Sequence, residues 1–175
     1  MSEGNVGNAA VSLRPATLAD ADLVFGWRND PFIVARGSSQ KTVSRDEHAN
    51  WFQATVTGSE RRMFIVEVDQ QPAGQVRFDR VDGESCVVSA YLLERYTGRG
   101  LGVEAIRDGC RRIFGKWDVQ VVIACVRQDN PAGRAGFLKA GFQENSSPRH
   151  CPPQHVELTL TRTAGVPNRK GAVRQ

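Results

Sequence analysis

Residues 97–102, Thr-Gly-Arg-Gly-Leu-Gly, are the part of this 175-residue chain that is best suited to binding a bulky anion. Gly98, Gly100 and Gly102 alternate with larger residues, and a backbone without Cβ atoms lets a ligand come close. A helix is expected to follow from Val103 to about Phe114. The free N–H groups and the dipole at its start favour negative charge, so the turn suits a pyrophosphate. Strand-to-helix turns also use glycine for purely structural reasons, so the pattern alone leaves both interpretations open.

Two familiar nucleotide-binding patterns do not fit this turn. No Lys-Ser or Lys-Thr pair follows the glycines, so the lysine-containing P-loop is absent. The glycines also lack the Rossmann spacing, and no strand–helix–strand unit opens the chain. The remaining common ligand of such a turn is the pyrophosphate of coenzyme A.

The elements around the turn alternate between strands and helices. The sequence predicts strands at 11–14, 63–68, 74–79, 85–93, 119–126 and 156–160. Helices are predicted at 18–28, from 45 through Phe52, at 103–114, and from Asn130 to a stop at Gly141. Helices thus interrupt a sheet that has hairpins in one half and a crossover in the other. This order predicts a mixed three-layer α/β domain (mixed α+β).

Capping residues mark two of the helix starts. Thr17 precedes the first helix, and aspartates follow it in the first turn. Ser44 and Glu47 have the spacing of a capping box before the second helix. Asn29-Asp30-Pro31 is predicted to stop the first helix, and Gln70-Gln71-Pro72 is predicted to turn the chain between two strands.

The charge is distributed in a way that argues against nucleic-acid binding. The formal net charge is +4, and residues 162–175 hold Arg162, Arg169, Lys170 and Arg174 without any acid, so residues 1–161 are close to neutral. A folded basic stripe with interleaved aromatic residues is missing. We expect a disordered N-terminus at 1–10, one domain at 11–161 and a basic disordered tail at 162–175.

The composition also bears on location, redox state and metals. No apolar run is long enough to cross a bilayer, and residues 1–15 lack the pattern of a signal peptide, so a cytoplasmic protein is expected. The four cysteines, Cys86, Cys110, Cys125 and Cys151, form no CxxC pair and are expected to stay reduced. His150, Cys151 and His155 offer only three ligands, so no metal site is predicted.

Three motifs together resemble the Gcn5-related N-acetyltransferase (GNAT) superfamily. They are Tyr91-Leu92-Leu93 running into the 97–102 turn, Asn130-Pro131-Ala132-Gly133 at a helix start, and Phe137-Leu138-Lys139-Ala140-Gly141-Phe142. The resemblance covers residues 11–161 and implies the three-layer GNAT fold, with a central mixed sheet of about six or seven strands flanked by helices. It also implies acetyl-CoA as co-substrate, bound by residues of these motifs: Leu92, Leu93, Thr97, Gly98, Arg99, Gly100, Leu101, Gly102, Asn130 and Phe137.

The resemblance implies direct transfer of an acetyl group to a primary amine. A backbone N–H near Leu92 or Leu93 would stabilise the negative charge on the carbonyl oxygen. The amine must lose a proton to a base, and His48 and Asp79 are the candidates. The simpler interpretations are that His48 packs its helix and that Asp79 is a surface residue at a strand end. Phe137 stands where the family often has the tyrosine that protonates the leaving thiolate, so that role is not carried over.

Two short motifs are similar to the branch that acetylates nucleotide-linked amino sugars, as in pseudaminic acid synthesis. They are 27–31, Trp-Arg-Asn-Asp-Pro, and the spacing Ser44-x-x-Glu47-His48-x-x-Trp51-Phe52. The candidate substrate-binding residues are accordingly Arg28, His48, Trp51 and Phe52, although aromatic residues in such a helix often belong to the core. Arg28 has a planar fork that suits phosphate.

Other acceptors and a non-catalytic role stay open. A protein N-terminus, a polyamine or an aminoglycoside are alternative acceptors, and a drug or polyamine acceptor predicts an acidic pocket. A binding module of the same fold that has lost turnover is suggested by Phe137. The sequence also leaves open whether the chain forms a homodimer.

Overall fold

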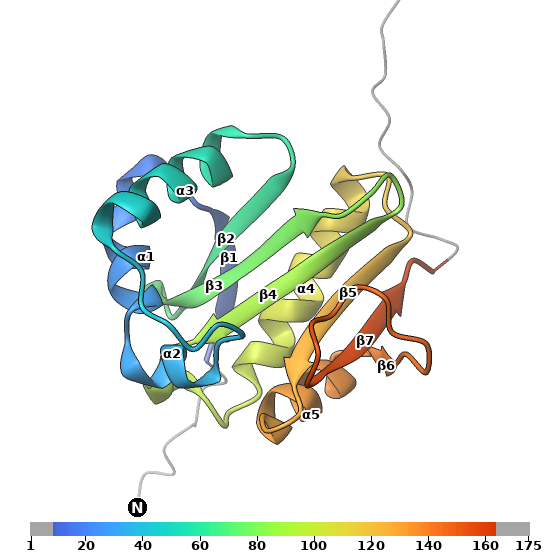
Figure 1. Ribbon diagram of the computed structural model, residues 1–175. Coiled ribbons are helices and arrows are strands. Elements are labelled where there is room, and N and C mark those ends of the chain that lie inside the picture. The colour runs from blue at the N-terminus through green and yellow to red at the C-terminus, as the bar shows by residue number, and fades with distance from the viewer. Residues whose placement is uncertain (1–8, 164–175) are drawn as a thin grey trace, which may run out of the picture.

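A seven-stranded mixed sheet forms the middle layer of the protein, as the resemblance implies (Figure 1). The structure is a computed structural model that describes residues 9–163. The strands are β1 (Val11–Pro15), β2 (Arg61–Val68), β3 (Gln71–Arg80), β4 (Ser85–Leu92), β5 (Val121–Arg127), β6 (Gln143–Glu144) and β7 (His155–Thr161). They lie in the order β1-β2-β3-β4-β5-β7-β6.

Only one neighbouring pair of described strands, β4 with β5, runs parallel. Their pairing joins Ser85–Val88 to Val121–Ala124 and ends there. β4 continues to Leu92 and β5 continues to Arg127 without pairing to each other. The two strands therefore part beyond Val88 and Ala124, and we call this opening the splay.

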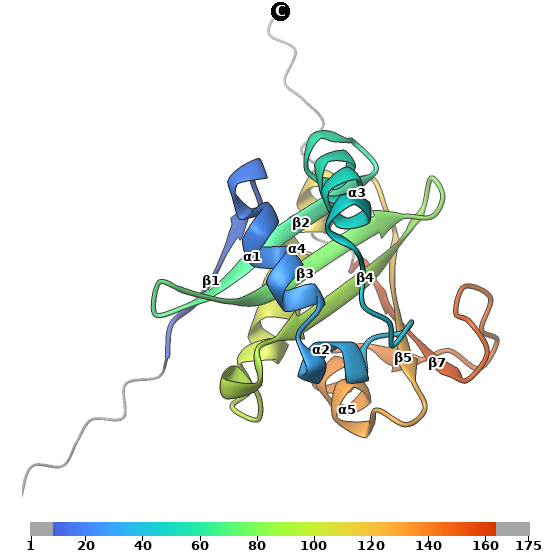
Figure 2. The same cartoon turned by 60° about the vertical axis from the view of Figure 1, so that its left-hand side comes forward.

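Helices cover both faces of the sheet (Figures 1 and 2). Helices α4 and α5 supply side chains to the larger buried core, on the face that we call the α4 face. Helices α1, α2 and α3 pack a second core against β2 on the opposite face, which we call the α3 face. The helices are α1 (Ala21–Arg28), α2 (Pro31–Arg36), α3 (Arg45–Thr57), α4 (Leu101–Lys116) and α5 (Pro131–Lys139).

The capping box predicted for α3 is confirmed. The Ser44 hydroxyl accepts a hydrogen bond from the Glu47 N–H at 3.2 Å, and a Glu47 carboxylate oxygen accepts one from the Ser44 N–H at 3.0 Å. These bonds satisfy backbone donors that the first turn of a helix leaves unpaired. Thr17 precedes the first helical turn, as predicted, and its N–H donates to Asp20 at 2.8 Å.

The predicted stop of the first helix at Asn29-Asp30-Pro31 is confirmed, since α1 ends at Arg28, whereas the turn predicted at Gln70-Gln71-Pro72 is misplaced. Asp30-Pro31 ends one helix but also begins α2, since Asp30 accepts from the Phe32 N–H at 2.8 Å and Pro31 suits the first helical position. The chain turns at Asp69 and Gln70, whose φ angles are 49° and 66°, so Pro72 lies inside β3 opposite Glu67. Strand β6 was also not predicted.

The folded domain extends beyond the predicted bounds of 11–161 at both ends. The Ala10 N–H donates to the Asp69 carboxylate at 2.9 Å. Arg162, assigned above to the tail, donates to the carbonyls of Trp117 and Val119 at 2.8 and 3.1 Å, beyond the last turn of α4. A cation at this negative end of a helix is favourable, so Arg162 belongs to the folded domain. The rest of the predicted disordered segments, 1–8 and 164–175, lies outside the described residues.

The expectation that all four cysteines stay reduced is wrong for two of them. Cys125 of β5 and Cys151 form a disulfide with a Cα–Cα distance of 5.3 Å. The segment from β6 to β7 folds back over β5, which brings together two residues that are 26 positions apart. Cys86 and Cys110 are free and buried. Within residues 9–163, the structure contains no helix both long and apolar enough to span a bilayer.

A substitution at Gly74 tests whether the close approach of β3 to the end of β4 is required. A Cβ atom there would lie 2.2 Å from the Tyr91 carbonyl oxygen and 2.8 Å from the Leu92 Cα, both of which are backbone atoms. Gly74→Ala should lower the free energy of unfolding in urea by about 1–3 kcal/mol, because overpacking forces the strands apart.

Gly26→Ala is the matched control, since a Cβ at this position in α1 would meet nothing within 4 Å. It should raise the free energy of unfolding by about 0.5–1 kcal/mol through helix propensity. A Gly74→Ala protein as stable as the wild type would show that the close approach of β3 and β4 is not a constraint.

Candidate functional site

The 97–102 turn has the geometry that its glycines predicted. Gly98 and Gly100 have φ angles of 73° and 77°, in the left-handed region that favours glycine, and Gly100 is the residue before α4. A Cβ at either position would meet nothing within 4 Å. Leu101 is only 4% exposed and anchors the turn in the core. The backbone between the two glycines is therefore exposed beside the N-terminus of a 16-residue helix.

The end of β4 presents one free side of its backbone to the splay. The Leu93 N–H donates to the Ala73 carbonyl at 2.8 Å and is thus occupied on the β3 side. Successive N–H groups of a strand point to opposite sides, so the Leu92 N–H points towards β5. Because the β4–β5 pairing ends at Val88, no strand partner faces it there. Of the two residues proposed from the sequence, only Leu92 has an N–H directed into the splay.

A pocket of ≈ 390 Å³ lies on the α3 face beside the end of β4. We call it the acceptor-side pocket. Helices α1 and α3 form its outer walls, and β3 and β4 form its floor. Its lining residues are Val24, Arg28, Val43, Glu47, His48, Trp51, Gln75, Arg77 and Tyr91.

Three buried polar atoms in this pocket have no hydrogen-bond partner among residues 9–163. They are His48 Nε2, Gln75 Oε1 and the Tyr91 hydroxyl. The side chains come from three different elements, and His48 and Gln75 are each only 3% exposed. Leaving such groups unpaired costs about 1–3 kcal/mol each, so the pocket is suited to a ligand that supplies hydrogen bonds.

His48 is surrounded by aromatic rings. Its ring centroid lies 5.4 Å from that of Phe25, 5.6 Å from that of Trp51 and 5.5 Å from that of Phe52. Burial lowers the pKa of His48, and the nearby charges of Arg28 and Arg45 lower it further. The imidazole is therefore held neutral near pH 7, in the form that can accept a proton.

The residues of the 27–31 motif build the wall of the pocket. Arg28 donates to the Lys41 carbonyl at 2.8 Å and to the Ser39 hydroxyl at 3.1 Å. Asn29 exchanges two hydrogen bonds with the backbone of Val43, at 2.8 and 3.1 Å. Together they fix the loop at 37–44 over the pocket. Arg28 uses its fork on neutral groups, so its positive charge has no carboxylate partner among residues 9–163.

Two of the candidate residues lie outside this pocket. Asp79 of β3 forms ion pairs with Arg61 at 3.0 Å and Arg77 at 2.8 Å and does not line the cavity. It is therefore committed to neutralising the arginines and is poorly placed as a base. Phe52 is 1% exposed in the core, because it lies one residue further around α3 than Trp51. Its predicted contact with a substrate has no exposed surface to support it.

The family model described as "Acetyltransferase (GNAT) domain" matches residues 11–143. The chain belongs to the GNAT acetyltransferase family. It is also 25% identical over 111 residues to the acetyltransferase PseH of Campylobacter jejuni subsp. jejuni, covering 63% of this chain and 69% of that protein.

Solved structures support the fold independently. AAC(6')-Ib in complex with ribostamycin and coenzyme A superposes with a TM-score of 0.76 at 19% identity, covering 87% of this chain and 94% of that one. Spermidine N-acetyltransferase from Vibrio cholerae, in complex with CoA and spermine, superposes with a TM-score of 0.74 at 18% identity. The match covers 86% of this chain and 95% of that one. The seven-stranded sheet and its flanking helices are thus those of a GNAT acetyltransferase.

The two remaining motifs of the GNAT resemblance have clear structural roles. Asn130 caps α5, because its side-chain oxygen accepts from the Gly133 N–H at 3.0 Å. Phe137 is 8% exposed and packs edge-on against Phe142, with ring centroids 5.1 Å apart. Whether either residue also contacts a cofactor stays a prediction.

The side chains of Cys151, His155 and His150 make other contacts in this GNAT domain. Cys151 is in the disulfide, His155 Nε2 lies 2.9 Å from the Ser38 hydroxyl, and His150 Nδ1 lies 3.8 Å from Glu157. Across the described range 9–163, no three His, Cys, Asp or Glu side chains gather as a metal site would require.

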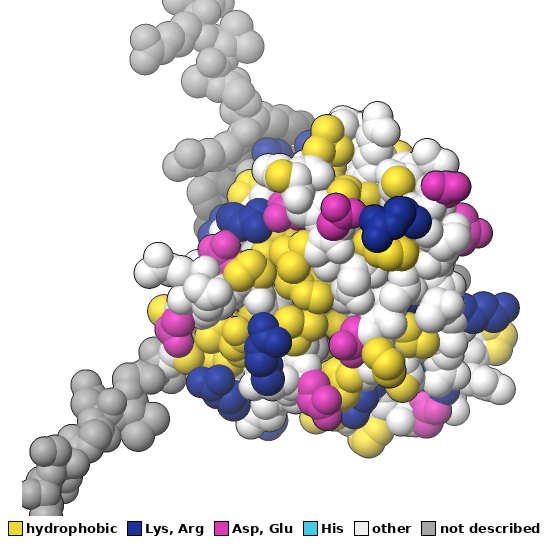
Figure 3. Space-filling model, turned by 90° about the vertical axis from the view of Figure 1, so that its left-hand side faces the viewer, with side chains coloured by type: hydrophobic (Ala, Val, Ile, Leu, Met, Phe, Trp, Pro, Cys, Tyr) yellow, Lys and Arg dark blue, Asp and Glu magenta, His cyan; other side chains and the backbone are white. Residues whose placement is uncertain are grey.

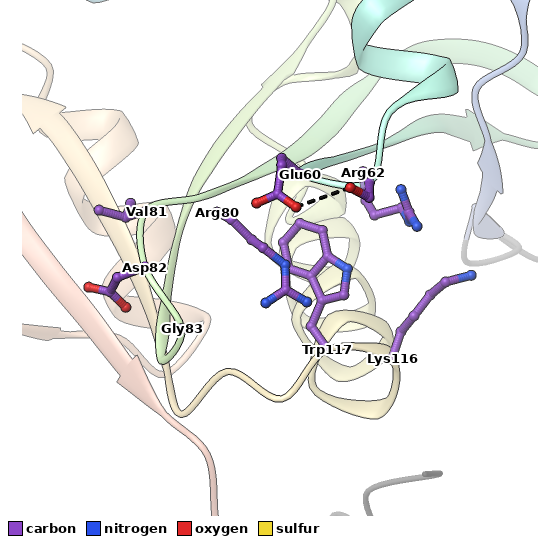
Figure 4. Close-up of a pocket in the computed structure, with 9 residues that line it drawn as sticks. Glu60, Arg62, Arg80, Val81, Asp82, Gly83, Lys116 and Trp117 are labelled. Atoms are coloured by element: carbon purple, nitrogen blue, oxygen red, sulfur yellow. Dashed lines mark hydrogen bonds between the residues drawn. The ribbon is translucent and has the colours of Figure 1, made fainter. Parts of the chain in front are cut away.

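A second hollow lies at the other end of the β3–β4 hairpin, away from the splay. It measures ≈ 440 Å³ and is open to solvent. Arg80 lies across the ring of Trp117 at 4.5 Å from its centroid, with Arg62 and Lys116 nearby (Figure 4). Because Arg80 itself covers the indole, the hollow offers no flat surface for a base or an aromatic ligand.

Gln75 and Tyr91 are the pocket residues that sequence analysis missed. They are directly opposite each other in the β3–β4 register, so their side chains share the α3 face. Tyr91 belongs to a motif of the GNAT resemblance that implied no acceptor contact. Gln75 has the same alternation as Arg77 and Asp79, so no local signal in this strand distinguishes it.

The depressed pKa of His48 predicts acid sensitivity of the fold. As the pH falls below the ordinary histidine value of 6.5, the unfolded chain binds a proton before the folded chain does. Neutral His48 therefore contributes to the free energy of unfolding above pH 6.5, and this contribution is lost as the pH falls below 6.5. Urea unfolding between pH 5 and pH 7.5 should show this slope, and His48→Gln should reduce it.

His150→Gln is the control, since His150 lies outside the pocket. An NMR titration in which His48 protonates at or above pH 6.5 would contradict the assignment of a neutral imidazole.

Proposed function

We propose that this GNAT acetyltransferase transfers the acetyl group of acetyl-CoA to the primary amine of a nucleotide-linked amino sugar. The observation that carries the proposal is the junction of the splay with the acceptor-side pocket. On one side lies an exposed glycine turn at a helix N-terminus, and on the other lies a pocket with unpaired polar groups and with Arg28, which has no carboxylate partner among residues 9–163.

The residues of the turn fit the diphosphate of the co-substrate. The N–H groups at the start of α4 and the backbone between Gly98 and Gly100 would bind its oxygens. The thioester supplies the activated acetyl group. The Leu92 N–H would donate to the carbonyl oxygen as negative charge develops on it, a contribution worth about 3–4 kcal/mol in comparable sites.

His48 is the proposed general base. It is the one residue of the two sequence candidates that lines the pocket, and its environment keeps it neutral. Its unpartnered Nε2 can accept the proton that the amine loses on attack. Glu47 also lines the pocket, but its carboxylate is held in the capping box of α3.

The charge of the pocket favours an acceptor that carries phosphate. Arg77 pairs with Asp79, whereas Arg28, which also lines the pocket, has no carboxylate partner in the described part of the chain. A polyamine or aminoglycoside is polycationic and would be repelled by Arg28. The outer face over α1 and α3 carries basic and acidic side chains in mixture, not an acidic surface (Figure 3). The similarity to PseH and the 27–31 motif point the same way.

The departure of the thiolate does not require Phe137 to be a tyrosine. Thiols have pKa values near 8.5, so a thiolate is stable enough to leave without full protonation. The buried Tyr91 hydroxyl is available in the same pocket, and burial raises the pKa of that phenol, which keeps it protonated.

A turnover assay on matched acceptors tests the proposal. The enzyme should acetylate a nucleotide-linked amino sugar with a kcat/KM at least about tenfold above that of the free amino sugar, an aminoglycoside, spermidine or a peptide N-terminus. Equal activity on the free sugar would contradict the acceptor assignment. Binding of acetyl-CoA without turnover on any acceptor would favour a non-catalytic module.

Two substitutions should separate the proposed roles. His48→Gln should lower kcat by about 10²–10⁴ and flatten the acidic limb of the pH profile, because no base remains. Arg28→Lys should mainly raise the acceptor's KM, since a lysine cannot both reproduce the two hydrogen bonds to the 37–44 loop and present its charge to the phosphate, which is remote from the reacting amine.

His150→Gln and Arg112→Lys are the matched controls outside the pocket. An unchanged kcat and pH profile in His48→Gln would exclude His48 as the base.

A further inference from the structure

The disulfide lies at the point where the two parallel strands part. The last paired residues are Val88 of β4 and Ala124 of β5, and Cys125 is the next residue of β5. Both Cys125 and Cys151 are partly exposed, so the bond is not sealed in the core. A partly exposed disulfide therefore lies at the inner end of the splay, where the two strands are closest.

Cys125 faces the same side of the sheet as the acceptor-side pocket. Ala124 and Val88 both belong to the core of the α4 face. Side chains alternate along a strand, so Cys125 and Tyr91 both point to the opposite, α3 face. The register places Cys125 directly opposite Glu157 of β7 on that face.

The segment 145–154, which carries Cys151, is held down independently of the disulfide. Glu157 is 2% exposed and accepts hydrogen bonds from the Asn145 side chain at 2.6 Å and from the N–H groups of Arg149 and His150 at 3.0 and 2.8 Å. Opening the bond would therefore leave Cys151 close to its partner.

We propose that Cys125 forms a mixed disulfide with coenzyme A, the thiol that the transfer reaction releases in the splay. This inference rests on the proposed function. The CoA thiolate attacks Cys125 Sγ, a CoA–Cys125 bond forms, the Cys125–Cys151 bond breaks, and Cys151 leaves as a thiolate. In the reverse step Cys151 attacks the mixed disulfide and releases CoA. No external oxidant is needed, because one disulfide replaces another.

The other two thiols of the chain are unsuited to this exchange. Cys86 is 0% exposed and Cys110 is 2% exposed, both in the core of the α4 face. Burial raises the pKa of Cys86 to about 12 and raises that of Cys110 as well, so neither forms a thiolate near neutral pH. Modification confined to the Cys125–Cys151 pair is thus the expected pattern.

Intact-mass spectrometry under non-reducing conditions provides the test. The full chain is incubated with CoA or with glutathione at equal concentration, and free thiols are alkylated before denaturation. CoA should open the bond faster by on the order of tenfold or more, since binding at the 97–102 turn raises its local concentration. The adduct should map to Cys125, with one new alkylated thiol at Cys151.

Two variants sharpen the result. Gly100→Asp should slow the exchange with CoA more than the nearly isosteric Gly100→Asn does, and neither substitution should change the exchange with glutathione. Cys151→Ser, treated with CoA disulfide, should retain one CoA on Cys125 and release one CoA thiol, because the resolving thiol is missing.

The outcomes separate this inference from the proposed function. If CoA binds in calorimetry but reacts no faster than glutathione, or if the adduct lies on another cysteine, the inference is wrong and the proposed function stands. If CoA does not bind, the proposed function itself fails.

Discussion

The end of the parallel pairing at Val88 and Ala124 is the constraint on which the rest of the molecule depends. A sheet normally satisfies the backbone groups of each strand through its neighbours, and here the last residues of β4 keep partners only on the β3 side. Ala73 holds the Leu93 N–H on that side, and the close approach of Gly74 leaves β4 no room to shift. The Leu92 N–H consequently points into an opening that a co-substrate chain can occupy.

The two faces of the sheet differ in the residues that surround this opening. On the α4 face, a continuous apolar core fixes the helix whose N-terminus carries the glycine turn. On the α3 face, the core is smaller, and it gives way to polar groups without partners next to Tyr91. The glycine turn and the side chains proposed to bind the amine thus lie on either side of one strand end. The loop at 37–44, fixed by Arg28 and Asn29, closes the second of these regions.

Local features of the sequence predicted local features of the structure well. The glycine turn, the Ser44–Glu47 capping box and the order of the main strands all depend on residues close together in the chain. The mixed sheet followed from that order. The splay itself could be expected only through the resemblance, because no local pattern records where two strands stop pairing.

The wrong or missing predictions for individual residues have two causes. Some depend on contacts between residues far apart in the sequence, and others depend on the direction in which neighbouring side chains of a helix point. Trp51 and Phe52 are neighbours, yet one lines the pocket and the other is buried, because each residue turns a helix by about 100°. Asp79 pairs with Arg61 of the neighbouring strand β2, a contact that its own strand did not reveal, as well as with Arg77 of β3. Gln75 and Tyr91 became a pair through strand register, and the cysteines met through the return of the chain after β6.

The central claim, that the backbone of the turn holds the diphosphate of acetyl-CoA, is tested most directly by calorimetry on Gly100→Asp and Gly100→Asn. Both side chains tolerate the left-handed conformation and have nearly the same size, so the pair isolates charge. The Asp variant should bind acetyl-CoA at least about tenfold more weakly than the Asn variant, which is about 1.4 kcal/mol. Equal affinity of a folded Asp variant and the wild type would contradict the account.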